Sequence, residues 1–345
     1  MEKDTKYLSA NQVYTFTKCK NIDELSALLE VESETIQNCI LAPQYQQFSI
    51  PKKKGGVRII LSPEPILKDL QSKIAKYLNL LYNVNIPSTV HGFIQSNPYL
   101  IRNIKTNAIP HLKKNYLLNL DLCDFFPSIT ALMVKESLMK FPGIKLNEEV
   151  ASIISLLASY NWKLPAGSPL SPILSNIVFY RTDLMLEVLA IKYKLNYSRY
   201  ADDLSFSADT KITENILSEL EAIISLDQFS FNKKKERLQT KYGAQWVTGI
   251  KVNTSPNISR KKIRLLRSIL HSWKLNGLEA AKIKYFENFP VIEQKKEKDF
   301  ISIIAGKIAY VKYVRKSISP NDSVIQKLEE KFKALVEDIN IKDLC

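Results

Sequence analysis

Two adjacent aspartates, Asp202 and Asp203, are the residues in this sequence whose types and spacing point most directly to chemistry. They lie between two short segments with the composition of β-strands, with Tyr197 and Tyr200 before them and Phe206 after them. This pattern predicts a tight hairpin with acidic residues at its tip. Neighbouring carboxylates repel each other unless a cation is present, so the pattern favours a metal site, although aspartate is also common in ordinary turns.

A third carboxylate follows a different segment of strand character. Residues 117–120 have the composition of a buried strand, and Asp121 follows where another apolar residue would be expected. A carboxylate at the end of a buried strand is either hydrogen-bonded by the backbone or held by a cation. Together with Asp202 and Asp203, it would supply the hard oxygen ligands that a site for two Mg²⁺ ions needs, with positions left open for phosphate and water.

The segment between these acidic motifs, residues 164–172, contains three prolines and Gly167. It predicts a rigid turn that leads into a helix, and its small residues would allow a bulky ligand to approach the backbone. An ordinary connector between two helices is the structural alternative. The position of the segment between the two acidic motifs favours a role that faces the substrate.

A basic hairpin is predicted nearer the N-terminus. Residues 48–51 and 57–61 are strand-like, and the three lysines at positions 52–54 lead into Gly55-Gly56, a good two-residue turn. A basic tip with Arg58 on the strand behind it would suit contact with phosphates. A solvated loop is the alternative explanation for an isolated run of charges.

Composition limits the class of protein. The chain has 345 residues, of which 45% are hydrophobic, and this predicts a globular protein of two or three domains. A net charge of +14 indicates a polyanionic partner, with nucleic acid the first candidate and an anionic membrane surface the second. No stretch approaches the roughly 18 apolar residues that span a bilayer, so we expect a soluble, cytosolic protein. The four cysteines are scattered and are expected to be reduced.

Helices are expected to position these groups. Apolar residues at three- and four-residue spacing predict helices over 63–82 and 150–160, and another helix begins near residue 173. After residue 255 the chain becomes basic and helical in composition. An apolar stripe in 259–274 is predicted to pack, and a final helix is predicted over 323–339. Beside the apolar stripe runs a basic one, formed by Arg260, Arg264, Arg267, His271 and Lys274.

Taken in order, these motifs resemble the successive palm motifs of reverse transcriptases. The matching residues are Asp121-x-x-x-Phe125-Phe126, Leu164-Pro165-x-Gly167-x-x-x-Ser171-Pro172 and Tyr200-Ala201-Asp202-Asp203. The hairpin with Arg58 resembles the fingers motif, and Asn232-Lys233-Lys234-Lys235 is similar to the lysine-bearing segment of the same enzymes. More narrowly, Asn107-Ala108-Ile109-Pro110-His111 and Val247-Thr248-Gly249 resemble signatures of retron reverse transcriptases. The resemblance covers roughly residues 48 to 275.

The resemblance implies an α+β fold with the right-hand polymerase architecture of fingers, palm and helical thumb. The expected divisions are an N-terminal helical extension over 1–47, fingers over 48–115, a palm over 116–255 with part of the fingers interleaved, and a helical thumb with the C-terminal helix over 256–345.

The resemblance also implies site residues. Asp121, Asp202 and Asp203 would be catalytic and would hold two Mg²⁺ ions, for which Mn²⁺ could substitute. The implied dNTP-binding residues are Arg58, Lys54, Phe126, Gly167 and Lys234, with Phe126 excluding ribonucleotides. Contacts with nucleic acid are implied for Asn107, His111, Val247, Thr248, Gly249, Arg260, Arg264 and Arg267. A structural role is the alternative for Asn107 and His111. Ala166 departs from the glutamine common at its position, so no inference about fidelity is carried over.

The function implied by the resemblance is RNA-templated DNA synthesis in the bacterial cytoplasm. A retron enzyme would copy a structured non-coding RNA from one of that RNA's 2′-hydroxyls, leaving a branched RNA–DNA molecule (msDNA), and would serve anti-phage defence with a separate effector protein. Two alternatives stay open. One is a reverse transcriptase of another bacterial lineage, of the intron, diversity-generating or abortive-infection type. The other is a catalytically idle RNA-binding scaffold, which would have no physical use for three convergent carboxylates.

Overall fold

The computed structural model describes residues 8–52, 55–287, 300–316 and 322–342. The chain divides into two compact units, of which the first comprises Met1–Asn107 and Tyr116–Leu238 and the second Ala108–Asn115 and Gln239–Cys345. Both helices and sheets are present, so the predicted α+β class is confirmed. The finer divisions into extension, fingers, palm and thumb stay predictions.

A four-stranded sheet carries the acidic motifs. Its strand order is β4-β5-β3-β6, with β3 (Tyr116–Asp121), β4 (Asn196–Tyr200), β5 (Asp203–Ala208) and β6 (Arg237–Thr240). Strand β5 pairs antiparallel with both β3 and β4. Leu117, Leu204 and Phe206 are fully buried, and the ring of Phe206 stacks on that of Tyr197 with centroids 4.7 Å apart. The predicted strand before Asp121 and the predicted hairpin around the aspartate pair are therefore both present.

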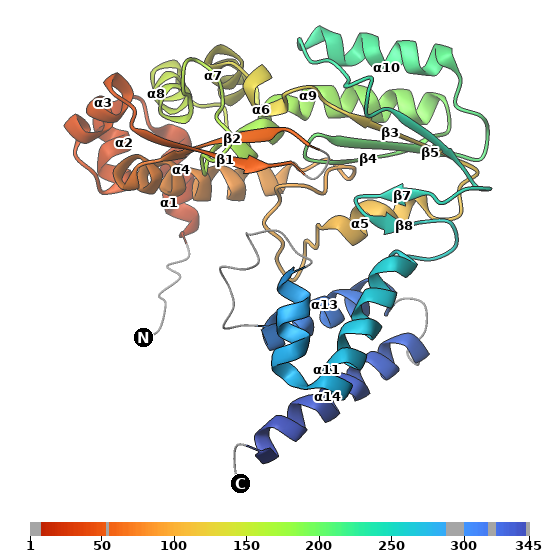
Figure 1. Ribbon diagram of the computed structural model, residues 1–345. Helices are drawn as coiled ribbons and strands as arrows, with labels where there is room; N and C mark the ends of the chain where they lie inside the picture. The colour runs from red at the N-terminus through yellow and green to blue at the C-terminus, as the bar shows by residue number, and fades with distance from the viewer. Residues whose placement is uncertain (1–7, 53–54, 288–299, 317–321, 343–345) are drawn as a thin grey trace. The chain divides into compact units, whose positions relative to one another are not determined.

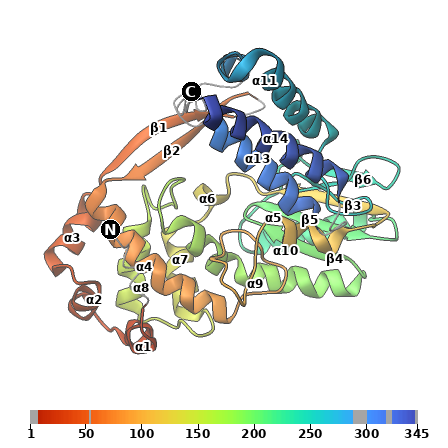
Figure 2. The same cartoon turned by 90° about the horizontal axis from the view of Figure 1, so that it is seen from below.

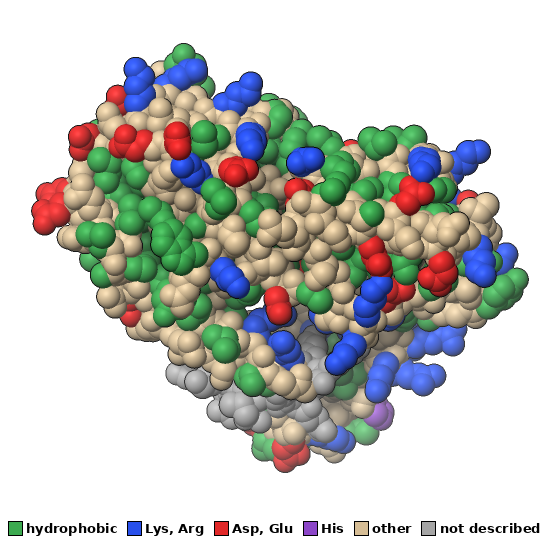
Figure 3. Space-filling view, turned by 90° about the horizontal axis from the view of Figure 1, so that it is seen from above, with side chains coloured by type: hydrophobic (Ala, Val, Ile, Leu, Met, Phe, Trp, Pro, Cys, Tyr) green, Lys and Arg blue, Asp and Glu red, His purple; other side chains and the backbone are tan. Residues whose placement is uncertain are grey.

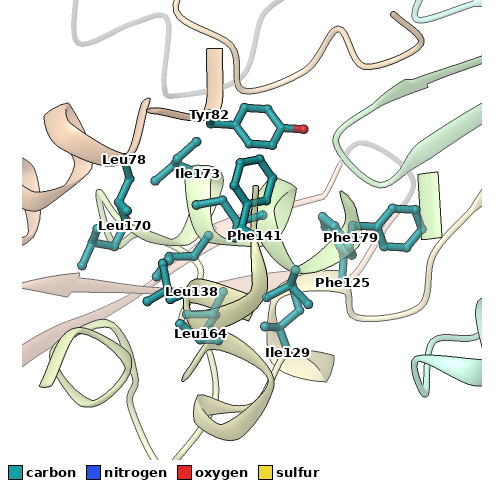
Figure 4. Packing of buried hydrophobic residues seen from close by; sticks show 14 of the residues in the cluster. Leu78, Tyr82, Phe125, Ile129, Leu138, Phe141, Leu164, Leu170, Ile173 and Phe179 are labelled. Atoms are coloured by element: carbon teal, nitrogen blue, oxygen red, sulfur yellow. The ribbon is translucent and has the colours of Figure 1, made fainter. Parts of the chain in front are cut away.

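Two helices, α9 (Ser171–Lys192) and α10 (Glu214–Leu226), lie over one face of this sheet (Figure 1). The hydrophobic core continues to α4 (Pro65–Val84), whose Leu78 and Tyr82 lie near Phe141 and Ile173 (Figure 4). The other helices before α9 are α1 (Ala10–Lys18), α2 (Ile22–Leu29), α3 (Ser33–Leu41), α5 (Ile104–Ala108), α6 (Phe125–Ser128), α7 (Ala131–Lys140) and α8 (Glu148–Ala158). The helices predicted over 63–82, over 150–160 and from residue 173 correspond to α4, α8 and α9.

The predicted basic hairpin is formed by β1 (Tyr45–Pro51) and β2 (Val57–Pro63), and it projects from helices α2–α4 (Figure 2). Gly55 and Gly56 both have positive φ angles, 91° and 83°, which glycine adopts without a steric penalty. In register, Arg58 faces Ile50 across the hairpin. The lysines at positions 53 and 54 lie outside the described residues, so the dNTP contact expected of Lys54 stays a prediction.

The turn before α9 contacts the hairpin. The amide of Leu61 in β2 donates to the carbonyl oxygen of Ala166 over 2.8 Å. Gly167 has a φ of 126°, and a Cβ atom there would lie 2.5 Å from the carbonyl oxygen of Leu61. A side chain would therefore collide with backbone that has no freedom to move away. The close approach of strand β2 is therefore sufficient to explain why residue 167 is a glycine, without any contact with a substrate.

Where the structure describes it, the second unit contains a small hairpin and three long helices. The hairpin pairs β7 (Trp246–Val247) with β8 (Ile250–Lys251), and the 3₁₀ helix η1 (Ile109–His111) also belongs to this unit. The helices are α11 (Arg260–Glu287), α13 (Phe300–Arg315) and α14 (Ser323–Lys342). The ring of Trp273 in α11 lies 5.8 Å from that of Phe300 in α13 and 6.1 Å from that of Phe332 in α14, so the three helices share one core.

The two stripes predicted over 259–274 are confirmed. Helix α11 begins at Arg260 and kinks at Gly277, whose φ is 83°. Its apolar stripe is buried and consists of Ile263, Leu266, Leu270 and Trp273. The basic stripe is exposed and consists of Arg260, Arg264, Arg267, His271 and Lys274.

The cysteines that are described, Cys19, Cys39 and Cys123, are free thiols, as expected. Cys345 lies outside the described residues. No helix in the described part of the chain is long and apolar enough to cross a membrane.

Replacing Gly167 with alanine should lower the free energy of unfolding by about 1–3 kcal/mol, because the Cβ atom would meet the Leu61 backbone and the φ of 126° is unfavourable for alanine. Urea denaturation measures the change. Gly306→Ala in helix α13 is the control, since no atom lies within 4 Å of its added Cβ, and alanine there should stabilise by up to about 1 kcal/mol. Equal stability of Gly167→Ala and the unchanged protein would contradict the contact with β2.

Candidate active site

The register of the central sheet brings the predicted carboxylates together. Asp121 at the end of β3 is the pairing partner of Asp203 at the start of β5. One residue further on, the amide of Leu122 donates to the carbonyl oxygen of Asp202 over 3.0 Å. The backbone thus fixes three carboxylates from two chain segments at one end of the sheet.

The hairpin tip differs slightly from the prediction. Asp203 is the first residue of β5 and pairs with Tyr200 of β4, so the two-residue turn consists of Ala201 and Asp202. Ala201 has a φ of 59°, a left-handed conformation that is uncommon for a residue with a side chain. Only one aspartate is therefore in the turn, and the other is held by the strand ladder.

The site concentrates negative charge in a partly buried position. Burial, with the charges of Asp202 and Asp121, raises the pKa of Asp203 to about 6. Burial and the Asp121 charge also raise the pKa of Asp202, and the charges of Lys235 and Arg58 oppose that shift. Carboxylates raised by like charges are stabilised in their ionised form by a nearby cation. Three hard oxygen donors of this kind fit divalent Mg²⁺ or Mn²⁺ chemically.

Lys235 forms an ion pair with one of these carboxylates, that of Asp121. Its Nζ atom lies 2.5 Å from Oδ1 of Asp121, whose side chain is 15% exposed. The sequence pattern identified the lysine-rich segment and assigned a dNTP contact to Lys234, which stays a prediction. The spacing of three consecutive lysines could not indicate which of them lies beside Asp121, because that depends on how the segment packs near β3. Among the described residues, no group of three or more acidic, histidine or cysteine side chains is arranged so that it could hold a metal ion.

Phe126 lies in the short helix α6, five residues after Asp121, and is half-buried. Its ring stacks on those of Phe93 and Phe125, with centroids 5.7 and 5.8 Å away. Phe125 is buried in the core, whereas Phe126 keeps part of its surface accessible. The role expected of Phe126 in excluding ribonucleotides stays a prediction.

The residues that resemble retron signatures differ in burial. The side chains of Asn107 and His111 are both fully buried, which favours a structural role for them over direct contact with RNA. Val247 is buried too, and Thr248 and Gly249 form the two-residue turn between β7 and β8, with φ angles of 45° and 81°. The nucleic-acid contacts expected of these residues stay predictions, as do those of the exposed arginines of α11.

In the absence of divalent metal, acidification should stabilise the protein through Asp203. Its pKa of about 6 lies above the ordinary 3.8, so the folded state binds this proton more tightly than the unfolded chain does. The stabilisation that comes from this proton is fully present below the pKa of the unfolded chain and is lost as the pH rises through about 6. The free energy of unfolding should change by at most about 1.4 kcal/mol per pH unit. Urea denaturation in EDTA from about pH 4 to 8 measures it.

Asp203→Asn is the matched variant for this measurement, because it cannot titrate. Relative to it, the unchanged protein should gain stability as pH falls. A stability difference between the two proteins that does not depend on pH would contradict the raised pKa.

Comparison with known proteins agrees with this geometry. The family model for reverse transcriptase (RNA-dependent DNA polymerase) matches residues 50–290. The retron Mx65 reverse transcriptase of Myxococcus xanthus is 34% identical over 66% of this chain and 55% of its own length. The retron Ec86 reverse transcriptase of Escherichia coli is 30% identical over 73% of this chain and 77% of its own length.

The chain thus spans about half the length of the Mx65 relative. Among solved structures, a telomerase from Candida albicans bound to a fragment of telomeric RNA has a TM-score of 0.47 and 11% identity, covering 85% of this chain and 63% of its own. The family match over residues 50–290 and the identity to the Ec86 enzyme show that the chain belongs to the reverse transcriptase family and is of the retron type.

Proposed function

We propose that this chain is an RNA-directed DNA polymerase whose active site consists of Asp121, Asp202 and Asp203. The observation that carries the proposal is the β3–β5 register, which makes Asp121 the partner of Asp203 at the end of the two central strands of the sheet. The mutual electrostatic effect of the three carboxylates supports it, since Asp121 and Asp202 both raise the pKa of Asp203. Such a site is costly without cations and has a direct use with them.

In the proposed reaction, Asp121, Asp202 and Asp203 would hold Mg²⁺ through their carboxylate oxygens. When bound, two such ions supply Lewis acidity to the attacking hydroxyl and neutralise charge on the phosphates. Lys235 would leave Asp121 to make room for a cation, and its ammonium group would then be available to a phosphate. The chain forms no covalent intermediate with the nucleotide in this scheme.

Other residues would select and hold the nucleotide. Arg58 on the β1–β2 hairpin, with Lys54 at its tip and Lys234 after β5, would contact the triphosphate. Phe126 would crowd the 2′ carbon of an incoming nucleotide and disfavour ribonucleotides. Gly167 would lie beneath the nascent base pair, where the turn is supported by β2. The exposed basic stripe of α11 would follow the phosphates of the bound nucleic acid.

The retron relatives support a narrower proposal for the substrate. The template would be a structured non-coding RNA, and synthesis would begin from one of its 2′-hydroxyls, giving a branched RNA–DNA product. The protein would act in the bacterial cytoplasm, in defence against phage, together with a separate effector protein.

Purified protein should extend a DNA primer on an RNA template with dNTPs and Mg²⁺. The double variant Asp202→Asn, Asp203→Asn should lose at least about 10³-fold in rate, because metal ligands contribute several kcal/mol to the transition state. Asp69→Asn, which removes an exposed carboxylate of helix α4, is the matched control and should retain the rate. A folded protein that binds RNA but incorporates nothing, with RNA copurified from its native host, would point to the RNA-binding scaffold.

The DNA that copurifies from the native host should be joined at its 5′ end to a 2′-hydroxyl of RNA. Treatment with a nuclease that cleaves 2′–5′ branches should release a linear DNA, detected as a mobility shift in a denaturing gel and by sequencing across the junction. A linear product that grew from an ordinary 3′-hydroxyl would overturn the branched-product proposal but leave the polymerase proposal intact.

A further inference from the structure

A cluster of fully buried polar side chains lies directly behind the aspartate turn. Arg199 of β4 donates from Nε to Oδ1 of Asp183 (2.8 Å) and from Nη2 to Oδ2 (2.6 Å). The hydroxyl of Tyr197 donates to the same carboxylate over 2.7 Å. Arg199 and Asp183 are both 0% exposed, and the guanidinium also lies over the ring of Phe179 at 4.8 Å.

A buried ion pair of this kind is a weak source of stability. Removing two charges from water costs several kcal/mol, and apolar side chains of similar size often serve a core equally well or better. The cluster therefore has a use that well-packed apolar residues would not fulfil. What distinguishes Arg199 from such residues is its set of fixed, directional donors.

The remaining donors of Arg199 reach the catalytic turn. Its Nη1 atom donates to Oδ1 of Asn176 (3.0 Å) and to the carbonyl oxygen of Ala201 (3.1 Å). Ala201 is the turn residue with a φ of 59°, and it immediately precedes Asp202. The left-handed conformation of a residue with a Cβ is unfavourable on its own and needs support from its surroundings. A hydrogen bond to its carbonyl oxygen from a guanidinium that is itself fixed on both sides is such a support.

A second segment, residues 89–92, packs against the same turn. The amide of Arg199 donates to the carbonyl oxygen of Thr89 (2.8 Å), and the amide of His91 donates to the carbonyl oxygen of Arg199 (2.9 Å). Gly92 follows, and a Cβ atom there would lie 2.3 Å from the amide nitrogen of Ala201. Asn176 joins the two supports, because its Nδ2 atom donates to the carbonyl oxygen of Gly92 over 3.1 Å.

We propose that Arg199, fixed by Asp183 and Asn176, is a positioning residue that sets the Ala201–Asp202 turn so that Asp202 and Asp203 face Asp121 in metal-binding geometry. This inference rests on the proposed polymerase function. Arg199 touches neither substrate nor metal in this scheme and acts through the Ala201 carbonyl. Lysine could not replace it, because one ammonium group cannot satisfy Asp183, Asn176 and Ala201 in the directions that the planar guanidinium serves.

The variant Arg199→Lys keeps the positive charge but loses the guanidinium hydrogen bonds to Asp183, Asn176 and Ala201. A second variant, Arg199→Met with Asp183→Leu and Tyr197→Phe, replaces the ion pair and the adjoining hydroxyl with apolar groups and so avoids a buried unpaired charge. Thr182→Val is the control. It removes a buried hydrogen bond of the same helix α9, from Thr182 to Asp227 (2.5 Å), at a place that does not contact the turn.

Three quantities decide the matter: Mn²⁺ affinity measured by electron paramagnetic resonance without nucleotide, thermal unfolding, and kcat and KM for dNTP. Groups that orient metal ligands typically change metal affinity by about 10–100-fold, so both Arg199 variants should weaken Mn²⁺ binding and lower kcat by that range, with little change in the KM for dNTP. Thr182→Val should lower stability alone.

Folded Arg199 variants that bind Mn²⁺ and turn over like the unchanged protein would overturn the inference and leave Arg199 with a merely structural role. If Arg199→Lys does not fold, the apolar variant gives the decision. Failure of the polymerase proposal itself is recognised separately, since the unchanged protein would then show no incorporation, and Asp203→Asn would not alter Mn²⁺ binding.

Discussion

The pairing of β3 with β5 is the constraint on which the rest of the candidate site depends. It sets Asp121 opposite Asp203 at the end of a buried sheet, so like charges are forced together by backbone hydrogen bonds rather than by side-chain preference. Burial, followed by the charges of Asp202 and Asp121, raises the pKa of Asp203, and Lys235 offsets part of the charge at Asp121. A divalent cation would relieve the same repulsion more completely, because it brings two positive charges to hard oxygen donors.

Holding that geometry requires support from segments far apart in the sequence. The aspartate turn is backed by Gly92 and by the guanidinium of Arg199, while the turn before α9 is fixed to β2 at Gly167. In both cases a glycine allows two backbones to approach within a distance that a Cβ atom would prevent. One hydrophobic core contains residues of α4, α9 and the sheet, and Figure 4 shows the packing of Leu78 and Tyr82 of α4 near Phe141 and Ile173.

Positive charge is distributed unevenly among the elements. On the face shown in Figure 3, lysine and arginine side chains are interspersed with acidic and hydrophobic ones. Helix α11 differs, since its exposed side presents Arg260, Arg264 and Arg267 in succession over a buried apolar stripe. Part of the net charge of +14 is therefore concentrated in one row on a single helix face. A row of this kind is chemically suited to contact a phosphate backbone. Asn107 and His111 are fully buried, which favours a structural role for them.

The sequence by itself determined the local features. Alternation of residue types predicted both hairpins, the apolar spacing predicted α4, α8, α9 and the two stripes of α11, and the order of motifs identified the family, because all of these depend on residues close together in the chain. Only the tertiary structure decided which residues meet. It placed Lys235 beside Asp121, assigned Asp203 to a strand rather than a turn, and buried Arg199 against Asp183. Those outcomes depend on strand register and on how distant segments pack, and neither is encoded in short-range spacing.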